Sequence, residues 1–272
     1  MVWLVFFGAA ALITYAASQL AKYGDIIAVR TRLGGMFIGI LLLAGATSLP
    51  EVLTSISAIG AGEPNLAAGN LLGSNMFNMF LLAVLDLAHR NERILRKAAL
   101  KHALTGSLAI FLIGLVTFFI IADFEVMIGW VGLDSLILIA AYIVALRLIQ
   151  SSNIKPPEQA EIPADTPPLW HGLFGFALAA AVLIFATPWM VEAAGEIAVI
   201  TGLGTTFVGT TLVALVTSLP ELVTTLAAAK LGADDMAIGN LFGSNMFNMF
   251  ALGLTDFFYT QGSFLGVVDP AF

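Results

Sequence analysis

The chain has 272 residues, of which 59% are hydrophobic and only 11% are charged, with a mean hydropathy of +0.97 and a formal net charge of −7. Soluble domains carry roughly 25% charged residues, so the composition excludes an ordinary water-soluble protein and indicates an integral membrane protein. The absence of cysteine excludes disulfides and thiolate metal sites. The acidic balance argues against a nucleic-acid partner.

Apolar stretches long enough to cross a bilayer predict an all-α, polytopic membrane protein with about eight transmembrane helices. In chain order these stretches lie at about 2–22, 35–60, 65–87, 102–122, 126–148, 169–191, 205–229 and 236–258. The first stretch is not typical of a cleaved signal peptide, because no basic residue precedes it and it ends at Lys22 rather than at small residues. We therefore expect it to be retained as a helix.

The stretch "QSSNIKPPEQAEIPADTPP" at 150–168 is long, polar and rich in proline, which predicts a linker. It divides the chain into a first repeat, 1–149, with helices one to five, and a second repeat, 169–272, with helices six to eight. All 11 Lys and Arg residues fall in or beside alternate connections, the linker among them. The positive-inside rule then places the linker in the cytoplasm and the N-terminus outside.

A repeated motif is the most informative feature of the sequence. "TSLPE" begins at Thr47 and again at Thr217, and "GNLLGSNMFN" and "GNLFGSNMFN" follow at the same distance in each copy. Residues 44–86 and 214–256 are identical at 23 of 43 positions. Five helices separate the starts of the two copies, so they cross the membrane in opposite directions, and an inverted repeat with broken helices points to a transporter site near mid-membrane. Close helix packing would explain the repeated glycines, but not the repeated Glu and Asn.

The repeated residues supply oxygen ligands. Pro50 and Pro220 each remove a backbone N–H and so leave a carbonyl unpaired within an apolar helix. Glu51 and Glu221 follow a Thr at helical spacing, so that carboxylate and hydroxyl share a face. Charged groups at this depth are costly and mark ion paths. With the neighbouring hydroxyls and amides they form an all-oxygen set with a charge near −2, which suits a hard cation such as Ca²⁺. Asn70 and Asn240 are expected either to bridge the helix breaks or to touch the ion.

These paired motifs resemble the two α-repeats of the calcium/cation antiporter superfamily, in particular its prokaryotic sodium/calcium exchanger-like members. The resemblance implies a secondary active antiporter with alternating access, in which Glu51 and Glu221 are the central ligands of the transported ion. It further implies that hydroxyls, amides and two backbone carbonyls complete the site, at Thr47, Ser48, Thr217, Ser218, Ser74, Asn78, Ser244, Asn248, Ala44 and Ala214.

Two departures from the family pattern bear on the prediction. Sodium-coupled members often carry Asp at the position of Asn78 or Asn248, whereas this chain has Asn at both. Ca²⁺/Na⁺ exchange is therefore the prediction, with Ca²⁺/H⁺ or another divalent cation/H⁺ exchange as the alternative. The family pattern also has ten helices, and the last two are not found here, which indicates either a fragment or a shortened relative.

Other classes of function fit the sequence less well. A channel would use similar oxygens, but usually in a ring of subunits. An enzyme would need a nucleophile and base or a metal triad, and the histidines, His89, His102 and His171, are expected near the membrane interfaces, away from the motif. A structural scaffold leaves the two carboxylates unexplained. We expect a multi-pass protein of the inner (cell) membrane with Ca²⁺, a monovalent counter-ion and the lipid bilayer as partners, without a cofactor or an evident protein partner.

Overall fold

The structure is a computed structural model that describes residues 1–33, 35–88, 94–122, 124, 126–152, 162–163, 165–201 and 213–269. The described residues are almost entirely helical, as expected where lipid offers the backbone no hydrogen bonds and each segment must satisfy its own. The long helices are α1 (Val2–Thr31), α4 (Leu49–Gly60), α5 (Pro64–Ala88), α6 (Ile94–Ala122), α7 (Leu133–Ser152), α8 (Leu169–Thr201), α11 (Leu219–Lys230) and α12 (Asp234–Thr255). The short elements are α2 (Gly35–Ile38), the π-helical turn η1 (Gly39–Leu43), α3 (Ala44–Thr47), α10 (Val213–Thr217), the 3₁₀ turns η3 (Asp256–Phe258) and η4 (Leu265–Val267), and the antiparallel strands β1 (Met127–Ile128) and β2 (Val131–Gly132).

Six helical stretches in the described part of the chain are long and apolar enough to cross a membrane, and they coincide with the first six predicted helices. The seventh predicted helix begins outside the described residues, and its described part is divided into α10 and α11. The eighth corresponds to α12. The first helix is longer than predicted and continues to Thr31, where the Arg30 guanidinium donates to the carbonyls of Thr166 and Pro167. The end of α1 is therefore tied to the chain just before α8.

Two broken helices carry the repeated motifs. The helical path from α2 through α4 is interrupted at Ser48, which has φ −88° and ψ 0°, and α10 gives way to α11 at Ser218, with φ −82° and ψ 4°. Pro50 and Pro220 occupy the first turn of α4 and α11, a position that needs no backbone N–H. The matching prolines thus start new half-helices at matching places.

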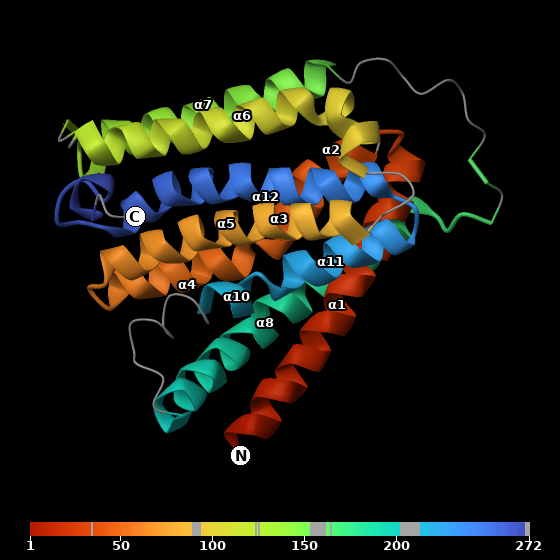
Figure 1. Ribbon diagram of the computed structural model, residues 1–272, viewed down its shortest axis with the longest axis horizontal. Helices are drawn as coiled ribbons and strands as arrows, with labels where there is room; N and C mark the ends of the chain where they lie inside the picture. Colours follow the sequence, from red (N-terminus) through yellow and green to blue (C-terminus); the bar gives the residue numbers. More distant parts are fainter. Residues whose placement is uncertain are drawn as a thin grey trace.

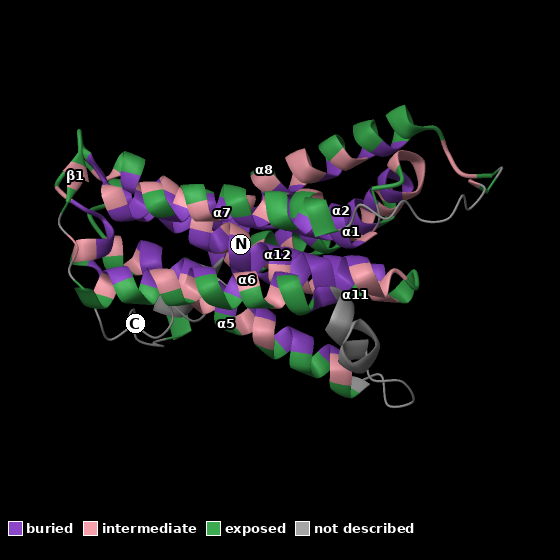
Figure 2. Ribbon diagram, turned by 90° about the horizontal axis from the view of Figure 1, so that it is seen from above, coloured by how far each residue is buried: buried purple, intermediate pink, exposed green. Residues whose placement is uncertain are grey.

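At the centre of the bundle, α12 is buried along nearly its whole length (Figure 2). Glycines allow η1 to lie directly on it. A Cβ at Gly39 would lie 2.5 Å from the Met236 carbonyl oxygen, and one at Gly243 would lie 2.6 Å from the Cα of Ile40. Real Cβ atoms do not approach so closely, so these glycines fix the contact between the first broken helix and α12. The repeated glycine at position 243 therefore serves packing, as expected for small residues between membrane helices.

A second layer is formed by α6 and α7, which lie along one side of α12, while α1 and α8 form a slanting pair on the other side (Figure 1). The α1–α8 pair has its own apolar core around Ile13, Leu20 and Leu183. At Gly175 the absence of a side chain leaves room for the ring of Tyr23. Between these two layers lie α4, α5, α11 and α12, which carry the repeated motifs.

The fifth predicted helix differs from the structure at its start. It was expected from residue 126, but Met127–Gly132 form a β-hairpin that turns at Gly129, with φ 68°, and α7 begins at Leu133. The buried carboxylate of Asp256 accepts hydrogen bonds from the backbone N–H of Gly132 at 2.6 Å and of Phe264 at 2.8 Å. Asp134 likewise accepts from the Ser263 hydroxyl at 3.0 Å. Both acids therefore anchor loops at this end of the bundle.

Candidate cation site

The two broken helices bring Glu51 and Glu221 together. Each glutamate lies in the first turn of the half-helix after its break, Glu51 in α4 and Glu221 in α11, and their side chains are 0% and 1% exposed. Each glutamate is linked to the break of the other copy, Glu221 through Ser48 and Glu51 through Ser218. Residues 170 positions apart in sequence thus share one buried site, as the repeat predicts.

Each carboxylate is contacted by the serine of the opposite copy. The Ser48 hydroxyl donates to Oε1 of Glu221 at 3.0 Å, and the Ser218 hydroxyl donates to Oε1 of Glu51 at 3.4 Å. Ser218 also lies 3.0 Å from the Ser74 hydroxyl. Because Ser48 and Ser218 correspond, as do Glu51 and Glu221, the two contacts are related by an approximate two-fold symmetry.

The asparagines make a second crossed pair, between α5 and α12. Asn78 donates its amide Nδ2 to Oδ1 of Asn245 at 3.0 Å, and Asn248 donates its Nδ2 to Oδ1 of Asn75 at 2.9 Å. Asn75 also donates to the backbone carbonyl of Asn245 at 3.3 Å. All four side chains are buried. The two copies are therefore joined by side-chain bonds on both the glutamate side and the asparagine side of the site.

Several buried oxygens in this region have no hydrogen-bond partner among the described residues. They are Glu51 Oε2, Glu221 Oε2, Asn78 Oδ1, Asn248 Oδ1 and Ser244 Oγ. Leaving a buried polar group unpaired costs about 1–3 kcal/mol, and more when it is charged. A set made only of carboxylate, amide and hydroxyl oxygens is the coordination chemistry of a hard cation. A cation bound to these five oxygens would therefore displace none of the hydrogen bonds among the described residues.

The remaining predicted ligands lie on the same helices but are partly engaged elsewhere. Thr47 donates to the carbonyl of Leu43 at 3.0 Å, and the carbonyl of Ala44 accepts from Ser48 N–H at 3.0 Å. Thr217 donates to Oδ1 of Asn70 at 3.3 Å. Ala214 lies in α10, and its side chain is outside the described part of the chain.

Asn70 and Asn240 bridge the halves of each hairpin. Asn70, in α5, donates to the backbone carbonyl of Glu51 and to the hydroxyl of Ser55 in α4, both at 3.2 Å. Asn240, in α12, donates to the hydroxyl of Thr225 in α11 at 3.0 Å. The sequence left two roles open for these residues, bridging between helices or contact with the ion. Their amide nitrogens form bridges between helices.

Sequence reasoning missed Asn75 and Asn245. Both belong to the repeated "GSNMFN", and their repetition was the signal that could have found them. On a helix, neighbouring residues point in different directions, so a residue next to an expected ligand is not itself expected at the site. The structure shows that Asn75 contacts Asn248 and that Asn245 contacts Asn78. They contact the candidate ligands rather than the carboxylates.

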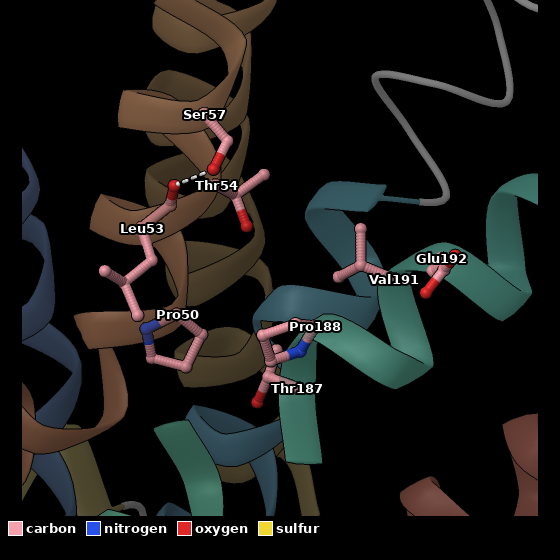
Figure 3. Close-up of a pocket in the computed structure, with 8 residues that line it drawn as sticks. All are labelled: Pro50, Leu53, Thr54, Ser57, Thr187, Pro188, Val191 and Glu192. Atoms are coloured by element: carbon pink, nitrogen blue, oxygen red, sulfur yellow. Dashed lines mark hydrogen bonds between the residues drawn. The ribbon is translucent and has the colours of Figure 1, made fainter. Parts of the chain in front are cut away.

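A cavity of about 220 Å³ lies beside the site, between α4 and α8 (Figure 3). Pro50, the neighbour of Glu51, lines one wall, and Pro188 of α8 lines the other. The exposed Glu192 and the hydroxyl-bearing Thr54, Ser57 and Thr187 contribute the polar part of the lining. The half-helix α4, which carries Glu51, therefore borders this cavity.

Of the three histidines, His102 lies at the start of a membrane-spanning stretch, His102–Ala122, with its side chain turned toward another helix. It is 3% exposed, and its Nε2 lies 3.3 Å from a carboxylate oxygen of Asp235 at the start of α12. His171 is exposed at the start of α8, and His89 lies outside the described residues. None of the described histidine contacts involves Glu51 or Glu221.

The long apolar helices, with two matched breaks that direct buried carboxylates to one oxygen-lined centre, define a polytopic membrane protein of the transporter class rather than an enzyme. The chain belongs to the sodium/calcium exchanger protein family, whose family model matches residues 1–149 and 171–271. This confirms the resemblance to the calcium/cation antiporter superfamily. The chain is accordingly a Ca²⁺/cation antiporter.

Individual relatives agree with this assignment. The chain is 29% identical to the inner membrane protein YrbG of Escherichia coli over 258 residues, which cover 89% of this chain and 75% of YrbG. It is 43% identical to the sodium/calcium exchanger MaX1 of Methanosarcina acetivorans over 88 residues, or 32% of this chain and 25% of MaX1. A solved structure of the sodium-calcium exchanger NCX_Mj, soaked with Na⁺ and Sr²⁺, matches with a TM-score of 0.71 and 26% identity over 97% of this chain and 85% of that one.

Proposed function

We propose that this protein exchanges Ca²⁺ for Na⁺ by alternating access, and that Glu51 and Glu221 are the carboxylates on which the two ions compete. The observation that carries the proposal is the pair of buried Oε2 atoms that have no hydrogen-bond partner among the described residues, at helix breaks related by the approximate two-fold symmetry. Two carboxylates balance one Ca²⁺ without a third acid. The hydroxyls and amides around them, at Ser48, Ser218, Ser74, Ser244, Asn78 and Asn248, complete the coordination, with Thr47, Thr217 and the carbonyls of Ala44 and Ala214.

Competition for one site enforces exchange. Moving two bare carboxylates through a low-dielectric interior is unfavourable, because each lacks the solvation that water or a cation gives it. Only the Ca²⁺-loaded and counter-ion-loaded forms then change sides, since the bound ions lower the energy of the transition between the two states. A carrier of this kind moves Ca²⁺ out of the cell when the counter-ion gradient points inward.

Ca²⁺/H⁺ exchange is the second candidate, and one observation favours it. Positions 78 and 248 both carry amides, so they add no charge to offset several Na⁺ ions. Protons on Glu51 and Glu221 would need no such addition. We favour Na⁺ because the relative MaX1 and the structural match NCX_Mj both carry the name sodium/calcium exchanger.

The arrangement in the membrane is part of the proposal. Residues 1–149 and 169–272 are the two inverted halves, the linker 150–168 is cytoplasmic, and the N-terminus faces outside, in the cell (inner) membrane. Helix inversion rests on the two-fold relation of the crossed contacts, and the orientation rests on the placement of Lys and Arg.

The proposal is tested by Glu51→Gln and Glu221→Gln in proteoliposomes, with ⁴⁵Ca²⁺ uptake measured under an imposed counter-gradient. Each change removes one of the two charges that balance Ca²⁺, so exchange should fall to the level of protein-free liposomes. The matched control is Glu63→Gln, at an exposed glutamate before α5, which should exchange normally. Wild-type exchange in either glutamate variant would overturn the shared-site proposal, and uptake that needs no counter-ion would indicate a channel instead.

A further inference from the structure

Asn75 and Asn245 are buried, matched in the two copies, and not among the expected ligands. Their side chains are 5% and 1% exposed, and each accepts a hydrogen bond from an asparagine of the opposite copy. The acceptor in both cases is the amide oxygen, and the donor is the amide nitrogen of Asn78 or Asn248. We propose that Asn75 and Asn245 are positioning residues that aim the amide oxygens of Asn248 and Asn78 at the cation; the inference rests on the proposed function.

An asparagine side chain has one oxygen and one nitrogen on a planar amide, so fixing the nitrogen also fixes the oxygen. In Asn78 and Asn248 the nitrogen is bonded to the opposite helix, while Oδ1 is buried without a partner among the described residues. Without Asn75 or Asn245, either amide could turn over and present N–H groups toward the site. A positively polarised donor in that place would repel the cation.

The same bonds select an amide at positions 78 and 248. Oδ1 of Asn75 can accept a hydrogen bond but not give one, and an ionised aspartate at 248 would present it with a second acceptor. Asn75 is held in this orientation by its own Nδ2, which donates to the backbone carbonyl of Asn245 at 3.3 Å. The crossed pair therefore favours neutral ligands beside Glu51 and Glu221 and keeps the charge of the site near −2, which one divalent cation balances.

The two halves of the pair are not equally anchored. Asn75 both accepts and donates across the interface, whereas Nδ2 of Asn245 has no partner among the described residues. Asn75 is therefore the more firmly held of the two partners, and it is the one replaced first in the test.

A double-mutant cycle tests this, because residues that act through one contact show non-additive effects. The variants are Asn75→Leu, Asn248→Ala and the two combined, each measured in proteoliposomes for the half-saturating Ca²⁺ concentration and the maximal exchange rate. Outer partners of metal ligands typically change affinity by about tenfold to a hundredfold. We expect Asn75→Leu alone to raise the half-saturating concentration by about tenfold with little change in maximal rate, and to add less than about twofold once Asn248 is alanine.

The control is Met76→Leu, at the neighbouring side chain, which is 76% exposed and should leave both constants unchanged. If Asn75→Leu does not fold, as judged by gel filtration in detergent, the mirror cycle of Asn245→Leu and Asn78→Ala takes its place. Equal effects of Asn75→Leu in the two backgrounds, or an unchanged half-saturating concentration, would overturn the positioning role. Wild-type protein that shows no Ca²⁺ exchange would instead overturn the proposed function, so the two failures are distinct.

Discussion

The hydroxyl of Ser48 donates a 3.0 Å hydrogen bond to the carboxylate of Glu221, although 173 positions separate the two residues in the chain. The corresponding serine, Ser218, makes the reverse contact with Glu51. In each copy of "TSLPE" the serine bonds to the glutamate of the other copy. The site therefore exists only where the two copies meet, and any motion of one half against the other changes its contacts.

Replacing Ser48 by alanine removes a ligand candidate and the hydrogen bond that orients Glu221. We expect Ser48→Ala to raise the half-saturating Ca²⁺ concentration by about tenfold, the effect typical of losing an orienting partner at a metal site. Equilibrium ⁴⁵Ca²⁺ binding and exchange in proteoliposomes measure it. Ser57→Ala is the control, because Ser57 lies in α4, the helix that follows Ser48, and among the described contacts its hydroxyl donates to the carbonyl of Leu53. An equal response of the two variants would show that Ser48 has no special relation to the ion.

Gly39 lies where η1 meets α12, and the expected effect of Gly39→Ala is on folding. Its new methyl group would lie 2.5 Å from the carbonyl oxygen of Met236, so the two backbones must separate. Overpacking of this kind typically costs about 1–3 kcal/mol. Thermal unfolding in detergent should show a lower midpoint than wild type. Gly114→Ala, within α6 and with nothing near the added Cβ, should unfold like wild type or later.

Much of the fold could be predicted from the sequence because membrane helices leave a strong apolar signal. The first six helices, the breaks at Pro50 and Pro220 and the meeting of Glu51 with Glu221 all followed from composition and from the repeat. The repeat also pointed to the candidate site, because charged residues kept twice in apolar segments have few structural explanations.

The sequence did not predict features whose local sequence signal is weak, or side-chain contacts that depend on how the helices pack. The hairpin before α7 is short and apolar, and it was read as helix because hydropathy does not distinguish the two. The position of His102 along its helix did not reveal that the side chain contacts Asp235 of α12. The partners of Asn75 and Asn245 depend on how α5 and α12 cross, which no sequence spacing defines.

Orientation in the membrane gives a prediction independent of transport. The positive-inside rule places the N-terminus and Glu63 outside and the linker around Lys155 in the cytoplasm. Reporter fusions at these positions, with an enzyme active on only one side of the membrane, measure the orientation. A fusion point after Gly114, within a span, should give low activity in both reporters. A linker outside the cell would contradict the charge argument and reverse the direction assigned to each half.

Whether the counter-ion is Na⁺ or H⁺ can be determined with ⁴⁵Ca²⁺-loaded vesicles, under either a Na⁺ gradient or a pH gradient with Na⁺ absent. If Na⁺ is the partner, the Na⁺ gradient alone should drive Ca²⁺ movement, and Asn248→Asp should strengthen the Na⁺ dependence, because the added charge offsets a further monovalent ion. If protons are the partner, they compete with Ca²⁺ for Glu51 and Glu221, so flux should fall as pH drops on the Ca²⁺-loading side, and Na⁺ should be dispensable. Asn78→Asp, the corresponding change in the first copy, serves as the matched variant, since Oδ1 of each amide has no hydrogen-bond partner among the described residues. Exchange driven equally well by a pH gradient without Na⁺, and unaltered by either aspartate, would exclude sodium coupling and leave proton coupling, because only protons need no additional ligand beyond the two carboxylates.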